Sequence, residues 1–339
     1  MSDVVALTSA LLAIDSTTGR EHEVVDFVAR WLIAREWNVM LQEVEPRRSN
    51  IWATRGCGGV TLSTHLDTVP PFFAPRVEGR RLYGRGACDT KGIIASMLLA
   101  AQQLVDDGEH RVDLLFVVGE EKGSPGAHAA NRLAATSKWL VNGEPTESKL
   151  ASGGKGAQRV IVRVRGREAH SAYAHLGRSA IDPMLALLPK LLDVVLPTDP
   201  VLGATTYNVG VLRAGTEANI VPGLAEAEIM IRLVGDVEPV KRAFAAWAGD
   251  DAELVWGSHI PAQHFHTLPG FEIEPVAYTS DIPLLSRWGT PLLFGPGSIH
   301  VAHTALEHIE IDELEASVGA YARIVRTLLA IPTFEHHIA

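Results

Sequence analysis

The chain has 339 residues, of which 47% are hydrophobic and 21% are charged, and its formal net charge is -10. This composition is typical of a folded globular protein, and the length favours two domains over one. The acidic balance argues against a nucleic-acid partner, because proteins that bind nucleic acids normally present a basic surface.

The sequence carries no sign of export or membrane insertion. Residues 1–15 lack the basic start and long apolar run of a signal peptide. No apolar run reaches the ~18 residues needed to span a bilayer. The two cysteines, Cys57 and Cys88, are too few for a disulfide framework and fit a reducing compartment. We therefore expect a cytoplasmic protein with no membrane partner.

Helical and strand patterns alternate through the first 150 residues. Apolar residues recur at helical spacing over 4–13, 21–34 and 91–105. Strands are predicted over 38–44, 50–54, 60–64, 112–118 and 138–141. The continuous apolar run 112–118 suits a strand covered on both faces. Together with a later strand over 290–294 and a closing helix over 311–330, the pattern predicts an α/β fold with three α/β/α layers and a mixed sheet.

The pattern changes after residue 156. Strands are predicted over about 159–165, 205–214, 224–233 and 252–256, with helices over about 180–192 and 238–248. The order β-α-β-β-α-β is the split pattern of a ferredoxin-like domain. We therefore predict an inserted ferredoxin-like α+β domain over 157–260, between residues 1–156 and 261–339 of the α/β domain.

Acidic and imidazole side chains follow the predicted strands of the α/β domain. They are His65, Glu120, Glu121, Glu144 and His303. Open α/β sheets place their ligands beyond the carboxyl ends of the strands. So many acids and imidazoles would repel one another or shift their pKa values unless a cation lay among them. Zinc accepts imidazole nitrogen and carboxylate oxygen, and two metals can share one carboxylate, so the sequence predicts a metal site.

Five motifs occur in a fixed order along most of the chain. They are STHLDTVP (63–70), GRGACDTKG (84–92), GEE (119–121), GEPT (143–146) and GPGS (295–298), the last followed by His303. Each motif is weak alone, but the combination is specific. The chain resembles the di-zinc aminoacylase/carboxypeptidase family, which includes acetylornithine deacetylase, acetylcitrulline deacetylase and succinyl-diaminopimelate desuccinylase.

The resemblance implies a ligand role for five residues. His65 and Glu144 would complete one zinc site, and Glu121 and His303 would complete the other. Asp89 would bridge the two zinc ions. Cobalt or manganese could replace zinc. Residues 1–156 and 261–339 would then form the catalytic metal-binding domain.

The resemblance also implies the chemistry beside the metals. Glu120 would act as the general base, taking a proton from the attacking water and passing it to the leaving amine. The carboxylate of Asp67 would hydrogen-bond the second ring nitrogen of His65 and fix the ring. A non-proline cis peptide is expected at Asp89–Thr90. Cys88 is expected to be a small packed residue and not a nucleophile.

Two choices between neighbouring residues rest on the family order. Glu120 is favoured over Glu121 as the base, because adjacent residues of an extended segment point apart and only one can face the metal. His303 is favoured as the ligand over His300 and His308, which we expect to be solvated.

The inserted domain is expected to complete the site. The segment around His170 resembles one whose histidine reaches the active site of the other subunit, where it would help hold the oxyanion. Asn219 and Arg232 match a pair that binds the substrate carboxylate, for which arginine is well suited. Glycines near Gly297 would add backbone amides to the same group. Residues 157–260 would thus serve as lid and dimerisation domain of a homodimer.

The resemblance implies hydrolysis of an N-acyl amino acid, with free amino acid and a carboxylate as products. Residues 207–210, 217–221 and 294–303 look most like the acetylornithine/acetylcitrulline deacetylase branch. The alternatives are succinyl-diaminopimelate desuccinylase, a dipeptidase or carboxypeptidase, and release of lysine or ornithine from a carrier protein. A non-catalytic metal-binding regulatory protein is disfavoured because neither the base nor a ligand is missing. A serine hydrolase is disfavoured because there is no Gly-x-Ser-x-Gly motif.

Overall fold

The computed structural model describes residues 2–56, 58–133 and 135–331, so Cys57 lies outside the described residues. The chain divides into two compact units. The α/β unit comprises Met1–Ser152, Phe265–Glu274 and Ser280–Ala339, and the inserted unit comprises Gly153–His264 and Pro275–Thr279. Among the described residues, no helix has the length and apolar character that crossing a membrane requires.

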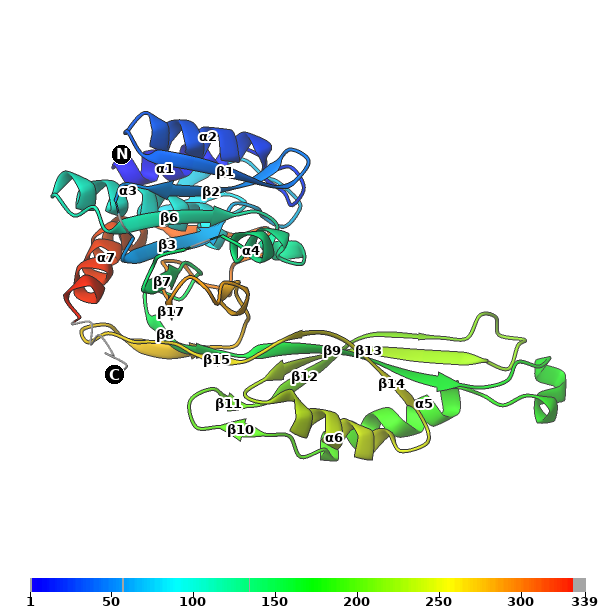
Figure 1. The fold of residues 1–339 in the computed structure, drawn as a ribbon. Helices are drawn as coiled ribbons and strands as arrows, with labels where there is room; N and C mark the ends of the chain where they lie inside the picture. The colour runs from blue at the N-terminus through cyan, green and yellow to red at the C-terminus, as the bar shows by residue number, and fades with distance from the viewer. Residues whose placement is uncertain (1, 57, 134, 332–339) are drawn as a thin grey trace. The chain divides into compact units, whose positions relative to one another are not determined.

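A six-stranded mixed sheet forms the centre of the α/β unit (Figure 1). Its strands, in spatial order, are β1 (Asn38–Glu45), β2 (Arg48–Thr54), β6 (Val112–Val117), β3 (Val60–His65), β7 (Trp139–Asn142) and β17 (Thr290–Leu293). The last four run parallel, while β2 pairs antiparallel with both the edge strand β1 and β6. The carboxyl ends of β6, β3 and β7 therefore meet at one edge.

Helices cover both faces of this sheet. The larger core packs four helices on one face: α1 (Asp3–Leu12), α2 (His22–Ile33), α3 (Gly92–Asp106) and α7 (Ile311–Ala330). On the other face, α4 (Pro125–Ala130) packs with Leu285 and Trp288 against a smaller core. Strand β6 serves both cores, because Phe116 faces the first and Leu115 faces the second. The predicted α/β/α layers and mixed sheet are confirmed.

Several short strands escaped prediction, because two to five residues carry too little periodicity to reveal a strand. A small sheet joins β4 (Arg76–Glu78), β5 (Arg81–Tyr83) and β18 (His308–Glu310). Another joins β15 (Gln263–His264), β8 (Leu150–Gly154) and β16 (Ile273–Val276), and β10 (Thr198–Asp199) pairs with β11 (Gly203–Ala204). His308 was predicted to be solvated, but its side chain is only 16% exposed and its ring centroid lies 5.0 Å from that of Tyr83.

The inserted unit has the predicted ferredoxin-like topology. Its antiparallel sheet has the order β12 (Thr206–Ala214), β13 (Leu224–Leu233), β9 (Gly156–Arg165) and β14 (Glu253–Ile260). Helices α5 (Ile181–Leu187) and α6 (Val237–Ala248) pack on it. The helix predicted over 180–192 is in fact divided, because a 3-10 segment (Leu188–Asp193) follows α5. Pro189, near the start of that segment, cannot donate a backbone hydrogen bond to continue the α-helix.

Candidate metal centre

Two overlapping clusters of imidazole and carboxylate groups lie in the α/β unit. His65, Asp89 and Glu144 form the first cluster, and Asp89, Glu121 and His303 form the second. Within each cluster, one potential ligand atom from every residue lies within 4.8 Å of the others. The structure thus brings all five predicted ligands together, with Asp89 shared by both clusters.

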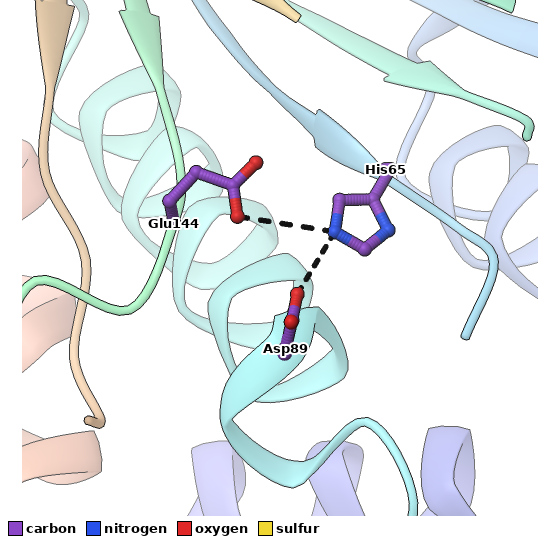
Figure 2. A group of neighbouring side chains, drawn as sticks. All are labelled: His65, Asp89 and Glu144. Atoms are coloured by element: carbon purple, nitrogen blue, oxygen red, sulfur yellow. Dashed lines mark hydrogen bonds and ion pairs between the residues drawn. The ribbon is translucent and has the colours of Figure 1, made fainter. Parts of the chain in front are cut away.

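The first cluster is built on adjacent parallel strands. His65 ends β3, and Glu144 follows β7, which pairs with β3 through Ser63 and Asn142. Asp89 lies in the segment before α3, where its backbone is non-helical (φ -127°, ψ 81°), and its peptide bond to Thr90 is cis, as predicted. The Nε2 atom of His65 lies 3.0 Å from Asp89 Oδ1 and 3.9 Å from Glu144 Oε2 (Figure 2). All three side chains are buried.

The second cluster is more open and depends on a loop. Glu121 follows β6 in a short 3-10 turn, whereas His303 lies ten residues beyond the end of β17. The Nε2 atom of His303 lies 3.0 Å from Glu121 Oε1 and 3.2 Å from Asp89 Oδ2. The side chain of His303 is 51% exposed, whereas that of His65 is 2% exposed. Solvent and substrate can therefore approach the centre from the second cluster.

The electrostatics of the centre favour a bound cation. Burial raises the pKa of Glu144 well above its usual range. Hydrogen bonds to Asp89 and Glu121 raise the pKa of His303 to about 10. Although burial opposes it, contacts with the imidazoles of His303 and His65 lower the pKa of Asp89. A divalent cation favours neutral imidazole and ionised carboxylate together, and this donor set fits zinc.

Asp67 has a different partner from the one predicted. The Nδ1 atom of His65 lies 2.9 Å from the backbone oxygen of Asp67, whereas the Asp67 carboxylate is 3.6 Å from that nitrogen. The carboxylate instead accepts the backbone N–H groups of Glu120 (3.0 Å) and Glu121 (3.2 Å) and the hydroxyl of Thr18 (2.7 Å). Its main contacts therefore fix the turn that carries both glutamates, and the backbone orients the imidazole.

Glu120 begins the turn after β6, and other acidic groups lie close to its carboxyl. Burial, together with the nearby charge of Asp281, raises the pKa of Glu120 well above its usual range. Sequence reasoning missed Asp281, because a lone acid before an apolar run is a weak signal. Asp281 is 2% exposed, and the hydroxyl of Ser124 only partly offsets the burial of its carboxylate. Burial raises the pKa of this carboxyl to about 6.

Gly297 does not offer the free amide that was predicted. Its N–H donates to Glu313 Oε1 at 2.9 Å, so this donor is already engaged. Glycine is required here for packing, since a Cβ would lie 2.5 Å from Cys88 Cβ and the φ angle is +89°. Cys88 is buried as predicted, and burial raises the pKa of its thiol well above the usual range. A nucleophilic role for this cysteine is therefore disfavoured.

The inserted unit holds the three remaining predicted residues. His170 and Asn219 are exposed neighbours, because the N–H of Ser171 donates to the Asn219 backbone oxygen at 2.9 Å. Arg232 is half-buried near the far end of β13, where it lies opposite Thr206. At ~3.3 Å per residue, β13 separates Arg232 from Leu224, at its start, by about 26 Å. The structure brings His170 and Asn219 together but not Arg232.

Comparisons with known proteins agree with this geometry. The model of peptidase family M20/M25/M40 matches residues 61–327. A peptidase M20 domain-containing protein of Schizosaccharomyces pombe is 36% identical over 336 residues, covering 95% of this chain and 84% of the relative. A probable carboxypeptidase of Emericella nidulans is 33% identical over 381 residues, covering 97% and 90%. Neither relative is named as a deacetylase.

Solved structures share the fold over nearly the whole chain. A tripeptidase from Staphylococcus aureus superposes with a TM-score of 0.81 at 20% identity, covering 96% of this chain and 98% of that one. An M20 family metallo-carboxypeptidase from Sulfolobus solfataricus gives a TM-score of 0.76 at 18% identity, covering 97% and 99%. At these identities the likeness shows the fold alone, and the family assignment rests on the sequence match. The chain belongs to peptidase family M20/M25/M40.

Proposed function

We propose that this protein is a two-metal hydrolase that cleaves an amide bond next to a free α-carboxylate and releases an amino acid. The observation that carries the proposal is the pair of ligand clusters that share Asp89, with Glu120 beside them at the end of β6. Two metals that share a carboxylate form a common hydrolytic centre. The imidazole and carboxylate donors suit zinc, with cobalt or manganese as substitutes.

The residues of the α/β unit divide the chemistry among them. His65 and Glu144 would hold one metal, Glu121 and His303 the other, and Asp89 both. When bound, the metals would polarise the amide carbonyl and lower the pKa of the attacking water.

Glu120 would accept the proton of that water and donate it to the leaving amine. A carboxyl with a raised pKa is suited to both transfers. Asp67 would hold Glu120 in place through the backbone of the turn.

Two features of the inserted unit support recognition of a carboxylate substrate. The guanidinium of Arg232 is half-buried and has no hydrogen bond or ion pair with any residue that the structure describes. Such a group is a ready partner for a carboxylate, assisted by Asn219. In His170, Nδ1 accepts the N–H of Ala172 at 3.1 Å, so the neutral ring carries its proton on Nε2. That exposed donor suits stabilisation of the oxyanion.

We propose that the protein is a homodimer through the inserted unit, with residues 157–260 as lid and dimerisation domain. His170 and Arg232 are separated by the length of β13, so one copy does not bring both to a small substrate. A second copy could supply His170 and Asn219 to a site that uses Arg232 of the first. The edge strand β12 exposes Val209 and Leu212, which suits pairing with another copy.

Mixing His170→Ala protein with Glu120→Gln protein tests this arrangement. Heterodimers would contain one intact site, so activity should reappear on mixing. No recovery despite confirmed subunit exchange would contradict the arrangement.

Two substrate classes fit this chemistry. The names of the relatives support a carboxypeptidase or dipeptidase, whereas the motif resemblance supports an N-acetylornithine or N-acetylcitrulline deacetylase. A hydrolysis assay of the zinc-loaded enzyme separates these two substrate classes. The substrates to compare are dipeptides, C-terminally amidated dipeptides, N-acetylornithine, N-acetylcitrulline and N-succinyl-diaminopimelate. We expect loss of activity on the amidated peptides. Equal cleavage of free and amidated peptides would contradict recognition of the carboxylate.

The central test of the proposal is Glu120→Gln. We expect kcat to fall at least 10²-fold with metal content unchanged, because general acid–base catalysis contributes about 10²–10⁴-fold. Glu23→Gln, on the exposed surface of α2, serves as the matched control. Activity of the Glu120→Gln protein within tenfold of wild type, with metal bound, would show that another group is the base.

A further inference from the structure

Glu307 is a fully buried acid that the proposed chemistry does not use. It is 0% exposed and lies four residues after His303. Its Oε2 atom accepts a hydrogen bond from Arg85 Nη1 at 2.6 Å, and Arg85 itself is 1% exposed. A buried ion pair of this kind persists only when further hydrogen bonds satisfy the remaining polar atoms. The other contacts of Glu307 therefore show what the pair holds.

Those contacts converge on the segment that carries the shared ligand. The Oε1 atom of Glu307 accepts the backbone N–H of Gly86 at 2.9 Å and that of Asp89 at 3.4 Å. The backbone oxygen of Glu307 accepts the N–H of Gly84 at 3.2 Å. A single residue thus binds residues 84–89 through both its side chain and its main chain.

The same residue anchors the loop that carries His303. This loop follows β17, and its next strand, β18, starts only at His308. His303 itself has a φ of +62°, a left-handed conformation that a side chain disfavours. Glu307 lies between His303 and β18, so its contacts with Gly86 and Asp89 connect one ligand loop to the other.

Two of the three residues of the first cluster do not need such a connection. His65 ends β3 and Glu144 follows β7, and these strands are hydrogen-bonded to each other, so the sheet fixes the spacing of His65 and Glu144. In the second cluster, the 3.2 Å approach of His303 Nε2 to Asp89 Oδ2 joins two loop segments. The strand pair beside them, β18 with β5, meets at His308 and Tyr83, five residues after His303 and six before Asp89, so it does not hold the two ligands directly. The two clusters therefore depend on Glu307 to different degrees.

We propose that Glu307, paired with Arg85, is a positioning residue that fixes His303 relative to Asp89 and so determines the metal affinity of the second cluster. The proposal rests on the two-metal function proposed above. Glu307 does not touch the metals or the substrate; it acts through the backbone of the residues that do.

The change Glu307→Gln shows why the effect should be selective. A glutamine keeps the shape but has one acceptor oxygen, so its NH₂ group must face either Arg85 or the N–H groups of Gly86 and Asp89. Either arrangement leaves a buried donor unpaired or Arg85 without a countercharge, which is costly enough to shift the segment. Loss of groups that orient metal ligands typically weakens metal binding about 10- to 100-fold.

The test is a zinc titration of the metal-free protein in competition with a chromophoric chelator. This readout resolves two binding steps without any activity measurement. Wild type should show both steps, and His303→Ala should lose the weaker one. We expect Glu307→Gln to keep the tighter step and to weaken the other at least tenfold. Asp113→Asn, which alters a buried acid at the amino end of β6, should leave both unchanged.

A second variant covers the case in which Glu307→Gln does not fold. The double change Arg85→Met with Glu307→Met removes both charges, so no unpaired ion is buried, yet the acceptor is still lost. It should show the same selective loss.

If His303→Ala loses a binding step, either of two results would refute the positioning role without refuting the two-metal centre. In the first, the Glu307 variants bind zinc in both steps with affinities within twofold of wild type. In the second, the zinc affinities of both steps fall by the same factor. If neither His303→Ala nor His65→Ala alters the titration, the two-metal centre itself is wrong, and the positioning role with it.

Discussion

The change Asp67→Asn tests how this aspartate supports the centre. The sequence alone suggests that its carboxylate holds the ring of His65, whereas the structure gives its shorter contacts to the turn of Glu120 and Glu121. Asparagine has the same shape, no charge and one acceptor oxygen instead of two. The hydroxyl of Thr18 can reverse and accept from the new NH₂ group, but one of the two backbone N–H groups then loses its acceptor.

The magnitude follows from that count. A donor left unsatisfied after losing its partner costs about 1–3 kcal/mol. We therefore expect the free energy of unfolding of the metal-free protein to fall by about this amount. Because the affected N–H groups belong to the proposed base and a proposed metal ligand, kcat/KM should fall about 10- to 100-fold, the range seen when groups that orient metal ligands are removed.

Thr18 provides the control that separates the two roles, because its hydroxyl contacts the Asp67 carboxylate at 2.7 Å. Thr18→Val removes this hydrogen bond, and Thr18→Ser keeps it. Thermal unfolding with a chelator, initial rates and zinc content are measured for all three variants. We expect Thr18→Val to lower both stability and kcat/KM, and Thr18→Ser to resemble wild type. If Thr18→Val is unchanged while Asp67→Asn loses zinc, the carboxylate acts through His65 and our reasoning is refuted.

Two further predictions concern protonation and packing. The pKa of His303 is raised to about 10, above its unfolded value of ~6.5, so its stabilising effect is full below pH ~6.5 and is lost as the pH rises toward 10. The metal-free protein should therefore lose thermal stability between pH 7 and 10. Zinc binding near pH 8 should release a proton from His303, which calorimetry in two buffers with different ionisation enthalpies measures. If His303→Ala releases the same number of protons on binding zinc as wild type, this assignment is contradicted. Gly297→Ala should destabilise the fold by more than about 1 kcal/mol, because Gly297 has a positive φ and an added Cβ would collide with Cys88. Gly319→Ala in α7, where an added Cβ meets no atom, should stabilise the fold by about 0.5–1 kcal/mol. Thermal unfolding of both glycine variants checks the pair, and equal shifts would contradict the steric argument.

Much of the fold follows from patterns that are local in the sequence. Apolar spacing predicted α7 and β13 with their observed bounds, because a helix or strand that buries one face must repeat its apolar residues at a fixed period. Pro189 shows the limit of that signal, since it interrupts the helix without disturbing the apolar pattern. Short strands such as β4 and β5 form only because a distant segment pairs with them.

The residues of the two clusters were also predictable, because imidazoles and carboxylates that follow neighbouring strands are candidate ligands whatever surrounds them. The groups that hold those ligands were not. An aspartate two residues from a histidine suggests a contact between their side chains, but here the backbone takes that place and the carboxylate turns to Glu120 and Glu121. Glu307 gives no signal in the sequence, because its partners lie more than 200 residues away. The sequence by itself determined which atoms can bind a metal, and only the tertiary structure decided which backbone segments hold those atoms in place, since that depends on contacts between distant parts of the chain.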